Sequence, residues 1–180
     1  MSIYCDRIKQ AAALIRQADG LIITAGAGLG VDSGLPDYRT SKGLYTAASE
    51  APPADSGEFQ HMSSELFLTS DPEGFWRFKW WLYEEFLKSV PHAGYSNLLR
   101  IAQSRPAGYV VYTSNVDKHF FRAGFQTDRI FECHGSMECL QCSQICHYSL
   151  YPIQTAYSQM KAAGVLVPLC PKCGKHQRPN

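Results

Sequence analysis

The sequence of 180 residues lacks several features that would assign it to a class at once. It has no apolar run close to the roughly 20 residues needed to cross a bilayer, and no apolar stretch follows a basic one at the N-terminus. We therefore expect neither a membrane span nor a signal peptide. The net charge is only +1, without a basic run, which argues against binding to nucleic acid through its phosphates. With 45% hydrophobic residues, the chain can bury the core of one domain, or of one domain with a small insert.

Seven cysteines are an odd number for a set of disulfides, and four of them form two C-x2-C pairs: Cys139, Cys142, Cys170 and Cys173. This pattern is typical of a zinc ribbon, in which four thiolates complete the tetrahedron and the metal is structural. The stretch 143–169 is longer than the usual spacing of about 15–20 residues, so we expect an excursion inside the ribbon. It contains Cys146 and His147, which are competing ligands. Without an export signal, a reducing compartment such as the cytoplasm is expected.

A cluster of glycines follows the apolar run 21–25, which predicts a buried parallel strand. Glycines at this place let the backbone approach a bulky ligand, most often the pyrophosphate of a dinucleotide. Only Gly26 and Gly28 match the G-x-G-x-x-G fingerprint, because position 31 is Val, and an ordinary strand–turn–helix is the alternative. The same loop continues to Asp37, Tyr38 and Arg39, either as part of a functional loop or as a turn with a solvated ion pair.

Polar residues follow two further predicted strands. The strand 108–113 runs into Ser114, Asn115, Val116 and Asp117, and open α/β sheets bind ligands at this carboxyl end. Asp117 is also suited to cap a helix over 118–123. A third short strand over 129–133 is followed by His134, which a glycine next to it allows to reach into a cleft.

An aromatic-rich helix is predicted to begin at Asp71, a good N-cap, with Pro72 in the first turn. Its aromatic and apolar residues occupy most faces, so it is either buried in the core or forms the wall of a pocket for an apolar substrate chain. The preceding residues 40–63 are rich in Ser, Ala, Pro and Gly and predict a loop with at most short helices.

Together these motifs resemble those of the sirtuins, the NAD-dependent protein deacylases. The stretch 26–39 is similar to the family's first NAD motif, 113–117 with 123–124 to the second, 133–136 to the motif of the catalytic histidine, and the C-x2-C pairs to its zinc module. The resemblance implies an α/β fold: a Rossmann-like parallel sheet in residues 1–136, with a helical insert at about 40–90, and a small zinc-ribbon domain at 137–176.

The resemblance also implies roles for single residues. NAD is the implied co-substrate and a structural zinc the implied metal, with the zinc held by the four cysteines of the C-x2-C pairs. An acylated lysine of a protein substrate would attack C1′ of the ribose through its carbonyl oxygen as nicotinamide leaves, with His134 as general base. The products would be free lysine and O-acyl-ADP-ribose. The implied NAD-binding residues are Gly26, Ala27, Gly28, Asp37, Tyr38, Arg39, Ser114, Asn115, Val116 and Asp117.

The sequence departs from the family pattern at Gly30, Val31, Tyr38 and Ser114, and it ends after the zinc module, without the C-terminal part of the family core. We therefore expect an incomplete sheet and weak or absent activity from these residues alone. Three functions stay open: a deacylase, an ADP-ribosyltransferase or NAD hydrolase on the same scaffold, and an inactive NAD- and zinc-binding fragment. The apolar helix slightly favours neutral acyl groups, and the oligomeric state cannot be read from the sequence.

Overall fold

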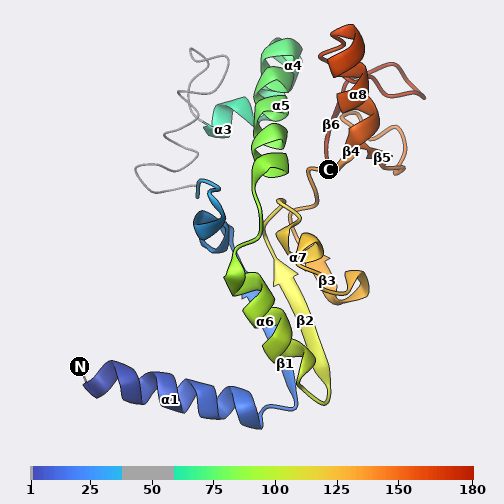
Figure 1. The fold of residues 1–180 in the computed structure, drawn as a ribbon. Coiled ribbons are helices and arrows are strands. Elements are labelled where there is room, and N and C mark those ends of the chain that lie inside the picture. The colour runs from blue at the N-terminus through green and yellow to red at the C-terminus, as the bar shows by residue number, and fades with distance from the viewer. Residues whose placement is uncertain (1, 38–58) are drawn as a thin grey trace.

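The computed structural model describes residues 2–37 and 59–180. Tyr38, Arg39 and residues 40–58 of the predicted loop lie outside the described residues. Figure 1 shows two assemblies of strands, one in the lower and one in the upper part of the molecule. The elements, in chain order, are α1 (Ser2–Gln17), β1 (Gly20–Ala25), the 3-10 helix η1 (Ala27–Ser33), α3 (Phe59–Met62), α4 (Glu65–Ser70), α5 (Pro72–Lys88), α6 (Ala93–Gln103), β2 (Gly108–Thr113), α7 (His119–Arg122), η2 (Thr127–Arg129), β3 (Ile130–Glu132), β4 (Cys139–Cys142), β5 (Tyr151–Pro152), α8 (Ile153–Ala163) and β6 (Gln177–Pro179).

The first sheet contains the three parallel strands β1, β2 and β3 in that order, which confirms the predicted α/β fold. The register pairs Ala25 with Thr113, so β1 and β2 end side by side. One face of the sheet is covered by a cluster that includes residues of α6, α7 and the strands themselves: Tyr95, Ala102, Tyr109, Val111, Phe120 and Phe125.

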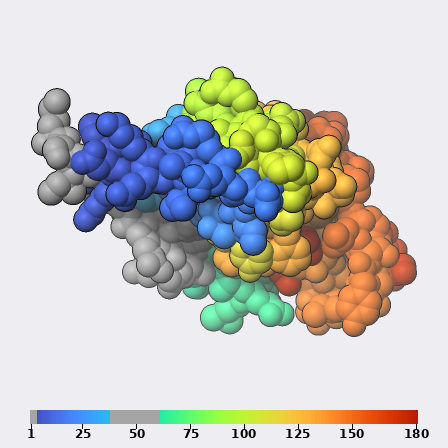
Figure 2. Space-filling view, turned by 90° about the horizontal axis from the view of Figure 1, so that it is seen from below, coloured from blue at the N-terminus to red at the C-terminus, as the bar shows by residue number. Residues whose placement is uncertain are grey.

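The other face of this sheet is exposed among the described residues. Ile22 is 79% exposed, and Val110, Tyr112 and Phe131 are about half exposed. The prediction that β1 and β2 are buried strands therefore holds for one face only, because no described helix covers the second. Helix α1 does not cover it fully either: its Ile8 and Leu14 are exposed, and Figure 2 shows the helix at the surface of the molecule.

Helix α5 joins the two halves of the molecule and begins as its sequence predicts. The Asp71 side chain accepts a hydrogen bond from the N–H of Gly74 at 2.9 Å, and Pro72 lies in the first turn. Most of its aromatic side chains are buried in a second core, where the Trp76 indole donates to the carbonyl oxygen of Gln177 and the Trp80 indole to that of Leu166. Core packing is therefore the main role of this helix.

The second sheet is antiparallel, in the order β5–β4–β6, and α8 packs beside it against α5. Tyr83 on α5 donates to the Gln154 side chain at 3.1 Å, and Tyr157 on α8 donates to Glu84 at 3.0 Å. Helix α8 forms the excursion expected between the two cysteine pairs. Among the described helices, none combines the length and apolar character needed to cross a membrane.

Candidate functional site

The loops that leave β1 and β2 are joined by hydrogen bonds. The side-chain amide of Asn115 donates to the carbonyl oxygen of Gly26 at 3.0 Å, and the Ser114 N–H donates to that of Ala25 at 3.1 Å. The Asn115 N–H is in turn held by the hydroxyl of Thr113 at 3.0 Å. The parallel register of the strands thus brings two motifs that lie far apart in the sequence to one edge of the sheet.

A small pocket lies between these two loops. It is lined by Ala27, Leu35, Pro36, Phe86, Asn115, Val116 and Asp117. Four of these residues are NAD-binding residues expected from the resemblance, whereas Leu35, Pro36 and Phe86 were not singled out. Phe86 comes from the end of α5, and the aromatic pattern of that helix could not distinguish it from the buried ring side chains.

Asp117 is buried, with 9% of its surface exposed, and its carboxylate is held by a hydrogen bond from the backbone. Oδ1 accepts a hydrogen bond at 2.9 Å from the N–H of His119, the first residue of α7. The N-cap residue of α7 is Lys118, without a side-chain cap, so the prediction that Asp117 caps a helix over 118–123 is wrong. Oδ2 lies 3.5 Å from the position that a Cβ would take at Gly30. The pocket therefore contains a fixed carboxylate, a good acceptor for amide N–H groups.

Gly26 and Gly28 line a different hollow of about 710 Å³, which runs along β1 to Leu98 and Ile101 of α6. A Cβ at Gly28 would meet nothing within 4 Å, which leaves room for a ligand close to the backbone. Ala27 lines both this hollow and the pocket of Asp117, so it marks the place where the two spaces meet. Asp37 is half-buried at the end of the same loop, while Tyr38 and Arg39 lie outside the described residues.

His134 lies two residues after the end of β3 and is exposed. It is not among the described residues that line the pocket of Asp117. The turn after it is fixed: Gly135 adopts a positive φ of 74°, and a Cβ there would lie 2.5 Å from the carbonyl oxygen of Asn180. The Ser136 N–H donates to this same oxygen at 3.1 Å, so the segment after β6 supports the His134 loop.

Among the described residues, one group of thiols could hold a metal ion: Cys142, Cys146, Cys170 and Cys173, whose Sγ atoms lie within 4.8 Å of one another. The distance is 3.6 Å between Cys142 and Cys173 and 3.7 Å between Cys146 and Cys170. A tetrahedron with Zn–S bonds of about 2.3 Å has S–S edges of about 3.8 Å, so these four thiols fit zinc. They are too far apart for disulfides, whose S–S length is about 2.05 Å.

Cys139, which the C-x2-C spacing predicts as a zinc ligand, does not belong to this group. Cys146 takes its place. The reason is the strand: Cys139 and Cys142 are the two ends of β4, and residues three apart on a strand point to opposite faces. Cys142 is buried on the face of Leu140, whereas Cys139 lies on the other. A turn at Ile145, with a positive φ of 49°, brings Cys146 back to Cys142.

His147 contacts the thiol cluster but is not a member of it. Its Nδ1 accepts a hydrogen bond from the N–H of Ser149 at 3.0 Å, so Nε2 carries the proton in the neutral ring and donates to the Cys170 Sγ at 3.3 Å. Hydrogen bonds from the backbone N–H groups of Cys146 and Gln144 also lower the pKa of the Cys142 thiol to about 6. Such donors favour the thiolate form that a zinc ion requires.

The Sir2 family model matches residues 26–180, which is most of the chain. The chain belongs to the Sir2 family. The match includes both loops of the pocket, His134 and the thiol cluster, so it covers the whole site described above.

Two curated bacterial relatives are similar along nearly the whole chain. An NAD-dependent protein deacylase 2 of Pseudomonas syringae is 32% identical over 170 residues, which are 94% of this chain and 64% of that protein. The protein of the same name from Pseudomonas aeruginosa is 30% identical, over 96% of this chain and 63% of its own length. This sirtuin chain thus spans less than two thirds of the length of these relatives.

Solved sirtuin structures resemble the fold. One, from work on sirtuin substrate affinity, has a TM-score of 0.74 and 26% identity, covering 96% of this chain and 64% of the other. A Sir2 structure with a p53 peptide and NAD+ has a TM-score of 0.72 and 26% identity, covering 96% and 62%. The α/β sheet with a cysteine-bearing module is therefore the sirtuin arrangement.

Proposed function

We propose that this sirtuin chain carries the NAD-binding, catalytic and zinc-binding parts of an NAD-dependent protein-lysine deacylase. The observation that supports this most is the pocket that Ala27 shares with Asn115 and Asp117, because it unites residues from both NAD motifs around a fixed carboxylate. The relatives whose printed names are those of NAD-dependent deacylases support the same conclusion.

NAD supplies the ADP-ribosyl group to which the acyl group is transferred. Gly26, Ala27 and Gly28 would hold its phosphates, where the backbone is open to a ligand. Ser114, Asn115, Val116 and Asp117 would hold the nicotinamide end, with the Asp117 carboxylate accepting from the carboxamide. Asp37, Tyr38 and Arg39 would lie on the loop beside the ribose.

His134 would act as the general base that takes a proton from a ribose hydroxyl. Imidazoles are well suited to moving protons at neutral pH. The exposed position of His134 after β3 leaves its ring accessible to a substrate, and the Gly135 turn against Asn180 fixes the backbone next to it. A peptide with an acylated lysine would be the second substrate.

The zinc site would have a structural role, because four thiolates leave no open position on the metal. It would be formed by Cys142, Cys146, Cys170 and Cys173. The two modules proposed from the sequence, residues 1–136 and 137–176, would then correspond to the parallel sheet and to the zinc-bearing sheet with α8.

The test is a deacylation assay with NAD and an acyl-lysine peptide, followed by mass spectrometry of both products. We expect the parent chain to release free lysine peptide and O-acyl-ADP-ribose, and the His134→Ala variant to lose this by a factor of about 100 or more. His61→Ala is the matched control, since His61 is an exposed histidine on α3 and should leave turnover unchanged. ADP-ribose formation without loss of the acyl group would instead favour an NAD hydrolase, and an unaffected His134→Ala variant would contradict the role of this residue.

A further inference from the structure

The carboxyl-terminal end of α5 forms one wall of the pocket that contains Asp117. Phe86, two residues before the helix ends at Lys88, supplies this wall. It also lines an adjoining hollow of about 160 Å³, together with Val116 and Asp117. The last carbonyl groups of a helix have no hydrogen-bond partner within the helix itself. The position of Phe86 therefore depends on the groups that bind the end of α5 from outside.

Two residues of α7 bind this end of α5. The Arg122 guanidinium donates to the carbonyl oxygens of Phe86, at 2.9 Å, and of Ser89. The Ser89 hydroxyl lies 2.8 Å from Nε2 of His119, and it donates its own proton to the carbonyl oxygen of Phe86 at 2.8 Å. Because a hydroxyl has only one proton, the imidazole is the donor to Ser89, and the neutral ring has its proton on Nε2.

His119 also binds the carboxylate of the pocket. Its backbone N–H donates to Oδ1 of Asp117 at 2.9 Å. The imidazole is completely buried, and its Nδ1 has no hydrogen-bond partner among the described residues. A leucine would fill this space without leaving a buried nitrogen unpaired, so packing alone does not account for a histidine here. One residue thus connects the carboxylate of the pocket with the wall at Phe86.

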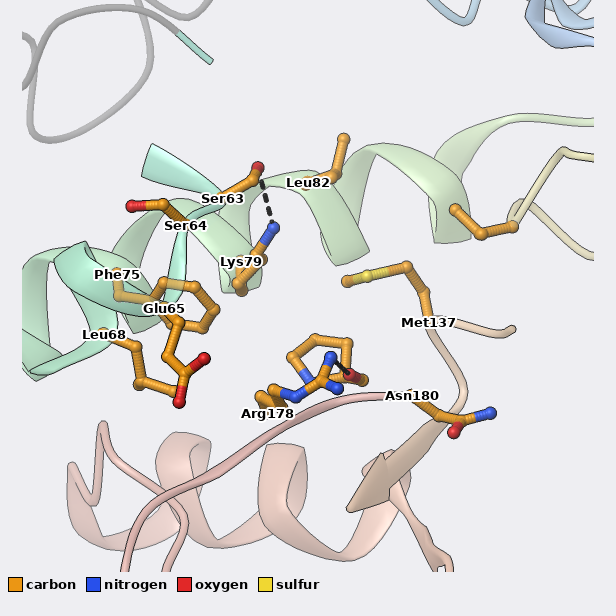
Figure 3. A pocket seen from close by; sticks show the side chains of 12 residues that line it. Ser63, Ser64, Glu65, Leu68, Phe75, Lys79, Leu82, Met137, Arg178 and Asn180 are labelled. Carbon is orange, nitrogen blue, oxygen red and sulfur yellow. Dashed lines mark hydrogen bonds between the residues drawn. The ribbon is translucent and has the colours of Figure 1, made fainter. Parts of the chain in front are cut away.

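The middle of α5 is held by other contacts. The indole groups of Trp76 and Trp80 donate to carbonyl oxygens of the second core. This part of the helix borders a larger cavity of about 410 Å³ (Figure 3). The lining of this cavity includes side chains from α5 and β6: Lys79, Leu82 and Arg178. Loss of the contact between α7 and Ser89 should therefore move Phe86 and leave the middle of the helix in place.

We propose that His119 is a positioning residue for the nicotinamide end of NAD, which it serves by holding Phe86, through Ser89, in register with Asp117. This rests on the proposed deacylase function, in which Asp117 accepts from the carboxamide. His119 itself does not touch NAD. The phosphates of NAD are assigned to the hollow of Gly26 and Gly28, which Phe86 does not line. The effect of His119 is therefore confined to the nicotinamide group.

The experiment compares two ligands that differ in the nicotinamide group: NAD and ADP-ribose. Isothermal titration gives both Kd values for the parent, His119→Leu, His119→Gln and Ser89→Ala. Gln can place an N–H group near the position of Nε2, whereas Leu fills a similar volume without a donor. Ser104→Ala is the control for Ser89→Ala, because Ser104 ends α6 in the same way and donates to the Ile101 carbonyl oxygen at 2.7 Å. His61→Leu, at an exposed histidine of α3, is the control for His119→Leu.

We expect His119→Leu and Ser89→Ala to raise the Kd for NAD by about fivefold to tenfold, as the loss of one buried hydrogen bond would give, and to leave the Kd for ADP-ribose within a factor of about two. His119→Gln should recover most of the NAD affinity, and both controls should match the parent. The double variant of His119→Leu with Ser89→Ala should bind NAD about as well as the weaker single variant, because both changes remove the same contact.

A purely structural role of His119 would weaken the binding of both ligands alike. An equal loss of affinity for NAD and ADP-ribose, or an unchanged affinity for NAD in His119→Leu and Ser89→Ala, overturns the inference while the proposed function stands. If the parent binds neither ligand, the proposed function fails, and the inference fails with it. Circular dichroism shows whether each variant is folded, and Ser89→Ala, which removes a single oxygen atom, decides the inference by the same two Kd values if His119→Leu is unfolded.

Discussion

The Asn115 side chain donates a hydrogen bond to the carbonyl oxygen of Gly26 at 3.0 Å, and this contact joins the loops that follow β1 and β2. It fixes two motifs, 89 residues apart, at one edge of the sheet. Because Asn115 is only 7% exposed, the hydrogen bond lies in an environment with little water, where it holds the loop geometry firmly. The pocket proposed for nicotinamide depends on this geometry.

Replacing Asn115 should therefore weaken NAD binding. We expect Asn115→Ala to raise the Kd for NAD by about tenfold or more, since a buried carbonyl loses its donor and the loop loses its anchor. Isothermal titration measures this directly. Asn97→Ala is the control, because Asn97 lies on the exposed side of α6 and contacts only Arg100 in the described hydrogen bonds. A Kd within a factor of two of the parent for Asn115→Ala would argue against the proposed pocket.

The zinc assignment predicts opposite outcomes for two neighbouring cysteines. Cys146→Ser should lose most of the bound zinc and several kcal/mol of stability, on the order of the values seen when a structural metal ligand is removed. Cys139→Ser should keep a full equivalent of zinc, because its side chain lies on the other face of β4. Metal analysis and thermal melting of the two purified variants test this. Zinc retained by Cys146→Ser but lost by Cys139→Ser would restore the pairing suggested by the C-x2-C spacing.

Lys79 should make stability depend on pH in a definite direction. Its pKa is about 7 in the folded protein and about 10.5 for a lysine in the unfolded chain, so between these pH values the unfolded chain binds more protons than the folded one. The contribution of Lys79 to stability is therefore least favourable below pH 7, and it becomes more favourable as the pH rises toward 10.5. Arg178 lowers the pKa further, and Glu65 is the acid that lines the same cavity.

Removing the amine should remove this dependence. We expect Lys79→Met to be more stable than the parent at pH 6, by roughly 1.4 kcal/mol for each unit of the pKa shift that is relieved, and the difference to shrink toward pH 10. Urea denaturation of both proteins at several pH values measures this difference. Because both proteins contain the same thiol cluster, the contribution of cysteine titration to the free energy of unfolding cancels in the difference between them. A constant difference across the pH range would show that Lys79 is not buried as a strained cation.

A buried ion pair next to the site makes a further prediction. Lys118 pairs with Glu132, and both side chains are about 15% exposed. Burial raises the pKa of Glu132, while Lys118 opposes this. Lys118→Met should therefore raise the Glu132 pKa further and destabilise the fold at pH 7 by about 1–3 kcal/mol, with a smaller loss at pH 5, because a larger fraction of the carboxyl is protonated there than at pH 7. Chemical denaturation of the parent and the variant at pH 7 and at pH 5 measures the loss of stability. An equal loss at the two pH values would contradict the prediction.

The sequence predicted the features that depend on local pattern. The strands before Gly26 and Ser114 follow from apolar runs that end in polar or glycine-rich loops, and the Asp71 cap of α5 follows from its own chemistry. Asp117 lies at the sheet edge as expected and lines the pocket there, but the N-cap position of α7 falls on Lys118 and not on Asp117.

Features that depend on the path of the chain were not predictable in this way. The C-x2-C spacing does not tell whether Cys139 lies in a turn or on a strand, and on β4 the side-chain alternation excludes it from the thiol cluster. Similarly, Lys79 stands among aromatic residues in the sequence, and only the fold brings Arg178, 99 positions later, to the same cavity. The exposed face of β1 and β2 also depends on what covers it, which strand patterns do not specify.

The most direct test of the account follows one oxygen atom. A peptide carrying acyl-lysine labelled with ¹⁸O in the acyl carbonyl is incubated with the chain and NAD in unlabelled water, and the nucleotide product is analysed by mass spectrometry after a brief reaction. The account predicts that the label moves to the 1′-oxygen of O-acyl-ADP-ribose, because the acyl oxygen itself attacks the ribose. Unlabelled ADP-ribose, whose new oxygen comes from water, or no consumption of NAD, would contradict it.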